Sequence, residues 1–173
     1  MTDRLVVALD VDGVLNPLGN PAKLDRRGFV KHRAVPVDGS HFDLWLHPDH
    51  GARLVQLAEA LSADLMWATT WNEHANTEIA PRIGLPALPV IEVTPPFRVK
   101  PGPHWKQREV LAAVGARPLV WIDDQFTPAD HRWSSIRPGT LLLRTDENVG
   151  LLEAHLEYVE KWWDREIGTY SVG

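Results

Sequence analysis

The stretch Leu5-Val6-Val7-Ala8-Leu9-Asp10-Val11-Asp12-Gly13-Val14-Leu15 decides the fold that we expect for this chain. Its first five residues are apolar without alternation, which is typical of a central parallel strand covered on both faces. Residues two apart in a strand point to the same side, so Asp10 and Asp12 project together where the strand ends. Two adjacent carboxylates repel each other unless they share a cation or a proton. Gly13 then permits a sharp turn or the close approach of a ligand. The alternative is an acidic turn without any further role.

The composition indicates one folded domain over residues 1–173, with 44% hydrophobic and 24% charged residues. A net charge of -5 argues against broad nonspecific binding of nucleic acid, although it leaves room for a local basic patch. The chain has no cysteine, which excludes disulfides, thiolate metal sites and a cysteine nucleophile. No apolar run has the length of a secretory signal or a membrane span, so we expect a cytoplasmic protein without a membrane partner.

A second apolar strand also ends in paired acids. Residues 119–122 read Leu-Val-Trp-Ile, and Asp123 and Asp124 follow them directly. Open α/β sheets place their ligands at the carboxyl ends of the strands, so the two acidic pairs should meet at one edge. Carboxylate oxygens are the ligands that Mg²⁺ prefers. The sequence therefore predicts a magnesium site formed by Asp10, Asp12, Asp123 and Asp124. We expect Asp10 and Asp123 to be its main ligands, with Asp124 assisting directly or through water.

Two hydroxyls and two lysines are candidates for contacts with a phosphate group. Thr69 and Thr70 follow a strand expected at 64–68, where a hydroxyl could hydrogen-bond a phosphate oxygen, although threonine is also a common helix N-cap. Lys106 falls in the first turn of an expected helix, where a lysine opposes the helix dipole and an anion would offset it. Lys100 lies in a proline-flanked loop and is the rival candidate. Either lysine could instead be an ordinary surface residue.

Strands that alternate with helices predict an α/β fold with a Rossmann-like parallel sheet of about five strands and helices on both faces. We expect strands at 5–9, 64–68, 88–93, 119–122 and 140–143, and helices after Asp49, over 72–80, from 103 to 115, over 128–133 and from 150 to 167. Residues 14–48 form an insertion between the first strand and the first helix. Within it, Phe29 to Val35 and His41 to Leu46 flank Asp38-Gly39, which predicts a β-hairpin flap beside the site.

The insertion also concentrates positive charge. Asp25 is the only acid between residues 23 and 33, a range that holds Lys23, Arg26, Arg27, Lys31 and Arg33. One interpretation is a solvated surface strand, and the other is a surface for a phosphate-rich substrate. A zinc site is not expected from the histidines and acids that follow, because their spacing matches no common zinc pattern: His41, Asp43, His47, Asp49 and His50.

Taken together, the motifs resemble those of the haloacid dehalogenase-like (HAD) superfamily of magnesium-dependent phosphohydrolases. They occur in the order of that family and span most of the chain: Asp-Val-Asp-Gly-Val-Leu at 10–15, Trp-Ala-Thr-Thr at 67–70, Lys106 and Trp-Ile-Asp-Asp at 121–124. The resemblance implies a Rossmann-like fold, Mg²⁺ as cofactor and a flap after the first strand. No large cap domain fits between the motifs. The tryptophan-rich pattern is also similar to the variant associated with bacterial RNA-repair proteins.

The resemblance implies that Asp10 is the nucleophile that forms an aspartyl-phosphate and that Asp12 is the general acid and base. The family has one threonine or serine where this chain has two, so Thr69 is preferred and Thr70 is kept as the alternative. The phosphate-binding lysine can likewise be either Lys106 or Lys100. Residues expected to bind substrate are Gly13, Thr70, Lys100, Arg26, Arg27 and Lys31.

The expected substrate is a phosphomonoester, either a small molecule such as a nucleotide or the phosphorylated end of a polynucleotide. A phosphotransferase would use the same residues. A nucleotide- or RNA-binding module with a structural cation is the non-catalytic alternative. A receiver domain is disfavoured because its acidic pair precedes its lysine, whereas Asp123 and Asp124 follow Lys106 here. The sequence makes no prediction of the oligomeric state.

Overall fold

A computed structural model describes residues 4–34 and 41–170, except for the side chains of 167–170. The elements are β1 (Val6–Leu9), α1 (Pro21–Arg26), β2 (Val30–Ala34), β3 (Phe42–Leu46), α2 (His50–Ala60), β4 (Asp64–Trp67), the π-helix η1 (Ala75–Ile79), α3 (Ala80–Ile83), α4 (Gln107–Val114), β5 (Leu119–Asp123), α5 (Pro128–Ser134), β6 (Thr140–Arg144) and α6 (Glu153–Tyr170). Within these described ranges, no helix is long and apolar enough to cross a membrane.

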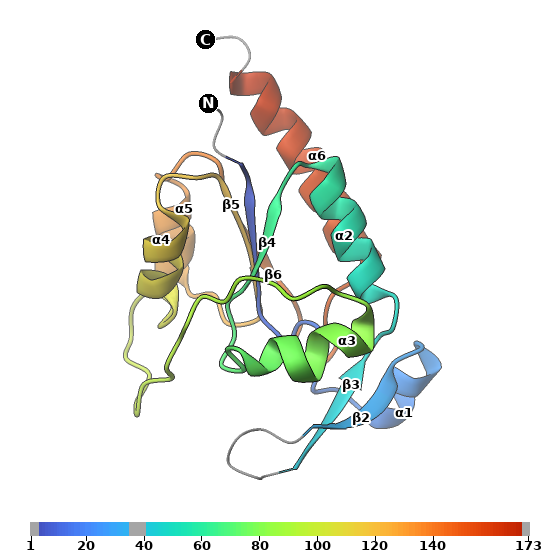
Figure 1. The fold of residues 1–173 in the computed structure, drawn as a ribbon. Helices are drawn as coiled ribbons and strands as arrows, with labels where there is room; N and C mark the ends of the chain where they lie inside the picture. The colour runs from blue at the N-terminus through green and yellow to red at the C-terminus, as the bar shows by residue number, and fades with distance from the viewer. Residues whose placement is uncertain (1–3, 35–40, 171–173) are drawn as a thin grey trace.

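Four parallel strands form the main sheet in the order β4-β1-β5-β6. Helices α2 and α6 lie on one face, and α4 and α5 lie on the other (Figure 1). The α/β, Rossmann-like fold is therefore confirmed, with four strands where about five were expected. The fifth segment, 88–93, joins the sheet through a single bridge between Val90 and Trp67. Pro89 lacks an N–H group, which limits the ladder that this segment can form.

The central strand β1 is completely buried, as its continuous apolar run predicts. Val7 and Leu9 belong to the core on the side of α2 and α6, whereas Val6 and Ala8 belong to the core on the side of α4. Burying a large aliphatic side chain stabilises the fold by about 1.5–3 kcal/mol. Packing on both faces thus holds β1 in place and fixes the position of Asp10 directly after it.

Several helix boundaries differ from the expectation. The segment 72–80 becomes a π-helical turn followed by α3, in which Pro81 stands in the first turn and Gly84 forms a left-handed cap. Pro81 therefore begins this helix instead of ending it. Asp49 occupies the N-cap position of α2 but makes no capping hydrogen bond. Helix α6 continues through Gly168 because one glycine costs a helix only about 1 kcal/mol.

The insertion contains the expected hairpin and an unexpected helix. Strands β2 and β3 pair antiparallel from Val30 opposite Leu46 to Ala34 opposite Phe42. The proposed turn at Asp38-Gly39 lies outside the described residues. Helix α1 was expected as loop and surface strand, although Asn20 caps its first turn and Pro21 begins it, both of which are helix-start signals. The hairpin, which we call the flap (β2 and β3), projects from the edge of the sheet where β1 ends (Figure 1).

Candidate active site

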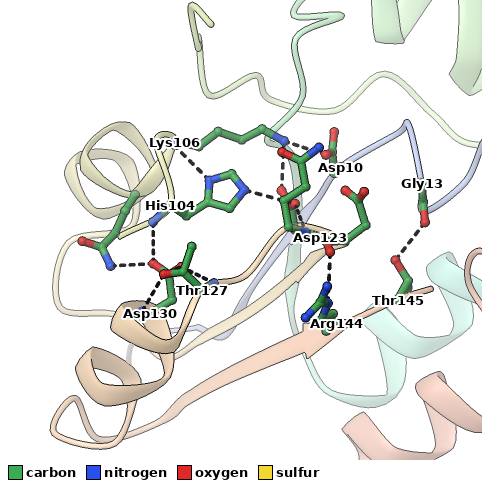
Figure 2. Close-up of polar contacts among 12 residues, drawn as sticks. Asp10, Gly13, His104, Lys106, Asp123, Thr127, Asp130, Arg144 and Thr145 are labelled. Atoms are coloured by element: carbon green, nitrogen blue, oxygen red, sulfur yellow. Dashed lines mark hydrogen bonds and ion pairs between the residues drawn. The ribbon is translucent and has the colours of Figure 1, made fainter. Parts of the chain in front are cut away.

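The register of the sheet brings the two acidic strand ends together. Leu9 pairs with Ile122 on β5, and the backbone N–H of Asp10 donates to the carbonyl of Ile122 over 3.0 Å. Asp10 and Asp123 therefore occupy corresponding positions on neighbouring strands, at the carboxyl edge of the sheet. Figure 2 shows their side chains with Lys106 reaching them from the segment before α4.

Lys106 connects the two strand ends. Its Nζ lies 2.6 Å from Asp10 Oδ2 and 2.9 Å from Asp123 Oδ2, and its side chain is only 3% exposed. Burial lowers the pKa of Lys106, but the two carboxylates raise it more, so the pKa stands above its ordinary value. Lys106 is the N-cap residue of α4, one position before the first turn where it was expected. Lys100 lies exposed in the preceding loop, so the structure brings Lys106 and not Lys100 to the acids.

His104 holds Asp123, and this role was missed in the sequence. The backbone N–H of Lys106 donates to His104 Nδ1 over 3.1 Å, which places the ring hydrogen on Nε2. That nitrogen donates to Asp123 Oδ1 over 3.1 Å, and the N–H of Gln125 donates to the same oxygen over 3.0 Å. Burial would raise the pKa of Asp123, but the hydrogen bond from His104 and the charge of Lys106 hold it well below its usual range. Both oxygens of Asp123 are thus engaged.

A second carboxylate fixes His104 in turn. Asp130 is fully buried, and its Oδ1 accepts from the backbone N–H of His104 over 2.8 Å. Its Oδ2 accepts from the N–H of Thr127 over 2.8 Å, as part of a capping box at the start of α5. Asp130 therefore ties the loop before α4 to the beginning of α5. In the sequence, the spacing Thr-x-x-Asp could have predicted the capping box at the start of α5.

Asp124 completes an acidic group that fits a metal ion. Asp10, Asp123 and Asp124 each offer a carboxylate oxygen, and these oxygens lie within 4.8 Å of one another. Asp124 Oδ1 is buried and has no hydrogen-bond partner among the residues that the structure describes. Burial, with a further contribution from Asp123, raises the pKa of Asp10 to about 7 and that of Asp124 to about 6. Three carboxylates facing one lysine leave an excess of negative charge, which a hard divalent cation such as Mg²⁺ would offset.

Gly13 is required by the close packing of the acidic group. Its φ is +77°, and a Cβ at this position would stand 2.6 Å from Asp124 Cγ. The hydroxyl of Thr145 donates to the carbonyl of Gly13 over 2.8 Å and holds the turn. The close approach that Gly13 permits is thus to the side chain of Asp124.

Asp12, expected as a fourth metal ligand, is not one of the three acids whose oxygens lie within 4.8 Å of one another. Its Oδ1 accepts from Asn16 Nδ2 over 2.7 Å, and its Oδ2 accepts from Trp71 Nε1 over 2.9 Å. Neither partner was identified in the sequence, although Asn16 follows the first motif and Trp71 follows Thr69-Thr70 directly. Asp12 is half-buried, which leaves part of its carboxylate accessible.

The two threonines differ in burial. Thr69 is fully buried, and its Oγ1 accepts from the backbone N–H of Trp71 over 3.3 Å. Within the described part of the chain, its hydroxyl hydrogen has no acceptor, so it is free to donate. Thr70 is exposed. Thr69 thus has an unused donor at the end of β4, and its preference over Thr70 for a contact with a phosphate oxygen stays a prediction.

The cations of the insertion differ in their contacts and in their exposure. Arg27 Nη1 donates to the carbonyl of Val149 over 2.8 Å, and its guanidinium lies over the ring of Phe29, so Arg27 holds the insertion to the domain. Lys31 forms an exposed ion pair with Asp43 over 2.8 Å. Lys23 and Arg26 are exposed on α1. Helix α1 lies on the side of the flap away from the loop that contains Lys100 (Figure 1).

The histidines of the insertion do not assemble with acids. Across residues 4–34 and 41–170, the acidic group around Asp124 is the one cluster of three or more potential metal ligands. His47 and His50 stack on each other, with ring centroids 5.1 Å apart, and both contact the ring of Phe29 edge-on. They pack as aromatic side chains, and the absence of a zinc site stays a prediction.

Comparison with known proteins identifies the family. The model of the HAD domain in Swiss Army Knife RNA repair proteins matches residues 6–156. No curated protein matches the chain. A structure from Legionella pneumophila, described as a provisional HAD superfamily (subfamily III A) hydrolase, is 15% identical, with a TM-score of 0.44 over 99% of this chain and 91% of that chain. Because the family model spans most of the chain, including both acidic strand ends and Lys106, the chain belongs to the family of HAD domains found in Swiss Army Knife RNA repair proteins.

Proposed function

We propose that this HAD superfamily hydrolase domain is a magnesium-dependent phosphohydrolase that cleaves phosphomonoesters through an aspartyl-phosphate intermediate. The observation that carries the proposal is the buried contact of Lys106 with Asp10 and Asp123, next to the unpartnered oxygen of Asp124. The proposed nucleophile Asp10, the cation of Lys106 and a carboxylate oxygen that could bind a metal lie together at the edge of the sheet where α/β enzymes bind their ligands. The membership of the HAD family supports the same chemistry.

The proposed reaction consists of two displacements at phosphorus. A carboxylate oxygen of Asp10 attacks, the bond from phosphorus to the leaving oxygen breaks, and Asp12 gives that oxygen a proton. Water then attacks the phosphorus of the aspartyl-phosphate while Asp12 takes the proton from the water, which releases phosphate and restores both acids. Lys106 and the hydroxyl of Thr69 offset and orient the charge on the phosphoryl oxygens.

The hydrogen bonds refine the roles of the two acids after β5. Asp123 accepts three hydrogen bonds, from His104, Gln125 and Lys106. Among the described residues, Asp10 accepts only two, from the backbone N–H of Val11 and from Lys106. Because Asp123 is the more fully engaged, we propose that it mainly holds Lys106. Asp10 and Asp124 would then hold Mg²⁺, with Asp123 beside them. Bound Mg²⁺ supplies positive charge that stabilises the transferring phosphoryl group.

Magnesium binding should displace protons, which tests this site directly. The pKa of Asp10 stands at about 7 and that of Asp124 at about 6, so protons compete with the metal below pH 7. Lowering the pH from 8 to 6 should therefore raise the Kd for Mg²⁺, by up to about tenfold per pH unit for each proton displaced. Calorimetric titration in two buffers of different ionisation enthalpy measures both the affinity and the protons released.

Asp124→Asn should weaken Mg²⁺ binding and remove the part of its pH dependence that begins below about pH 6, whereas the part that comes from Asp10, with a pKa of about 7, should remain. The control is Asp64→Asn, which removes a carboxylate that pairs with Arg4 and Arg117 at the opposite end of the sheet. Chelation with EDTA should stop turnover of para-nitrophenyl phosphate in the wild-type protein. Wild-type affinity in Asp124→Asn, or activity that survives EDTA, would contradict the proposed metal site.

For the substrate we propose the phosphorylated end of a polynucleotide. The matched family is described from RNA repair proteins, and the insertion that carries the positive charge contacts Asp12 through Asn16. Exposed cations could bind backbone phosphates beyond the one that is cleaved, which a small phosphoester does not offer. Since Arg27 contacts Val149 and Phe29, its loss would also disturb packing. The sharper test uses Arg26 and Lys31.

The variant Arg26→Ala/Lys31→Ala should raise KM for a phosphorylated oligonucleotide much more than for para-nitrophenyl phosphate. For the oligonucleotide, the slope of log(1/KM) against the logarithm of the salt concentration should become shallower. The change should be about 0.7 for each backbone phosphate that the variant no longer neutralises. The matched control is Arg108→Ala/Lys161→Ala, which removes the same charge from exposed positions on α4 and α6. Equal changes for both substrates, or for both double variants, would make the cations of the insertion an ordinary solvated surface.

A further inference from the structure

The orientation of the Asp12 carboxylate is determined by two neighbours that only donate to it. The backbone N–H of Trp45, on β3, donates to Asn16 Oδ1 over 2.8 Å. Because a backbone N–H cannot accept, the amide of Asn16 must present its oxygen to Trp45 and its NH₂ group to Asp12. Asn16 is buried at 5% exposure, and its Nδ2 donates to Asp12 Oδ1 over 2.7 Å.

The other oxygen of Asp12 is held from the segment that follows β4. Trp71 Nε1, which can only donate, lies 2.9 Å from Asp12 Oδ2. The indole ring meets the ring of Phe42 edge-on, with centroids 6.1 Å apart. Phe42 lies on β3, as does Trp45. One strand of the flap therefore contacts both groups that donate to Asp12.

We propose that Asn16 and Trp71 are positioning residues that set the carboxylate of Asp12 for proton transfer, and that β3 holds both in place. The inference rests on the proposed function, in which Asp12 is the general acid and base. Each carboxylate oxygen keeps a further lone pair after accepting one hydrogen bond, so the group can still bind and release a proton. Misplacing a reacting group by about 1 Å can cost about a hundredfold in rate.

Proton transfer to the leaving group gives the proposal a specific readout. In the first displacement, the bond between phosphorus and the leaving oxygen breaks, and the proton of Asp12 ends on that oxygen. A poor leaving group such as an alkoxide needs this proton, whereas 2,4-dinitrophenolate leaves without it. The ratio kcat/KM reports only the steps up to formation of the aspartyl-phosphate. A positioning defect at Asp12 should therefore grow as the leaving group becomes more basic.

Trp71→Phe removes the indole N–H and keeps an aromatic ring against Phe42. We expect kcat/KM for glycerol phosphate to fall by about ten- to a hundredfold, while kcat/KM for 2,4-dinitrophenyl phosphate changes by less than about threefold. Asn16→Asp should act in the same direction, because it keeps the acceptor for Trp45 and replaces the donor to Asp12 with an oxygen. The matched control is Trp67→Phe, which removes a buried indole hydrogen bond to Asn76, 2.8 Å long, that does not involve Asp12.

The outcomes separate this inference from the proposed function. Asp12→Ala should show the strongest dependence on the leaving group, and its absence would overturn the assignment of Asp12 itself. If Asp12→Ala shows that dependence but Trp71→Phe and Asn16→Asp lower kcat/KM equally for all leaving groups, their role is structural and the inference is overturned. Wild-type values in both variants would overturn it as well. Trp67→Phe is expected to lower thermal stability without changing the slope across leaving groups.

Discussion

Asp10→Asn should abolish measurable turnover, a loss on the order of 10⁶-fold in kcat, because a neutral amide has the same shape but is a poor nucleophile. The fold should persist, since β1 is held by apolar packing on both faces and position 10 stays polar. Steady-state assays with para-nitrophenyl phosphate at saturating Mg²⁺ measure the loss, and thermal unfolding checks the fold.

The covalent intermediate can be observed independently of the steady state. Rapid acid quench with a ³²P-labelled substrate should trap radioactivity on the wild-type protein, and peptide mapping should place it on Asp10. Asp10→Asn should trap none. A substrate chiral at phosphorus should react with overall retention, because two in-line displacements each invert the centre. Inversion would mean that water attacks the substrate directly, and it would remove Asp10 as the nucleophile.

Lys106→Met should lower kcat by about 10²–10³-fold, the usual cost of losing one donor to a developing oxyanion. Methionine fills a similar volume, but Asp10 and Asp123 lose the charge that lowers the pKa of each. The pKa of Asp10 should rise further above about 7. Since Asp10 must be ionised to attack phosphorus, the acid limb of the pH–rate profile should move to higher pH. Assays of kcat across pH 5–9 measure both effects.

The matched control for this variant is Lys100→Met, which changes an exposed lysine in the loop before α4. It should have a far smaller effect on kcat for a small phosphoester. A larger loss in Lys100→Met than in Lys106→Met would exchange the roles of the two lysines. A wild-type pH profile in Lys106→Met would contradict the coupling between this lysine and the carboxylate of Asp10.

The sequence alone determined the architecture and the edge at which the site forms. A continuous apolar run predicted the buried strand β1, and the alternation of strands and helices predicted the parallel sheet. Acidic pairs after two such strands predicted that Asp10 and Asp123 would meet, since parallel strands share a carboxyl edge. These predictions succeed because they depend on local periodicity and on strand direction, both of which are written in short stretches of sequence.

Secondary structure was predicted less well where proline and helix-start signals compete with apolar or charged patterns. The apolar residues of 88–93 indicated a fifth strand, but Pro89 limits its pairing to one bridge. The charged residues after Pro21 suggested a surface strand, although Asn20 and Pro21 begin α1. In both cases the residues that decide the structure, Pro89 and the pair Asn20-Pro21, lie within the segment itself.

Only the tertiary structure decided which side chains meet at the site. The sequence could not choose between Lys106 and Lys100, because the contact of Lys106 with Asp10 joins residues 96 positions apart. The hydrogen bond from Trp71 to Asp12 spans 59 positions, and it holds one oxygen of Asp12 from the segment after β4. Such contacts depend on the register of the sheet, on the path of the crossovers and on the direction of each side chain. No local pattern encodes these three together, so the functional pairings appear only once the chain is folded.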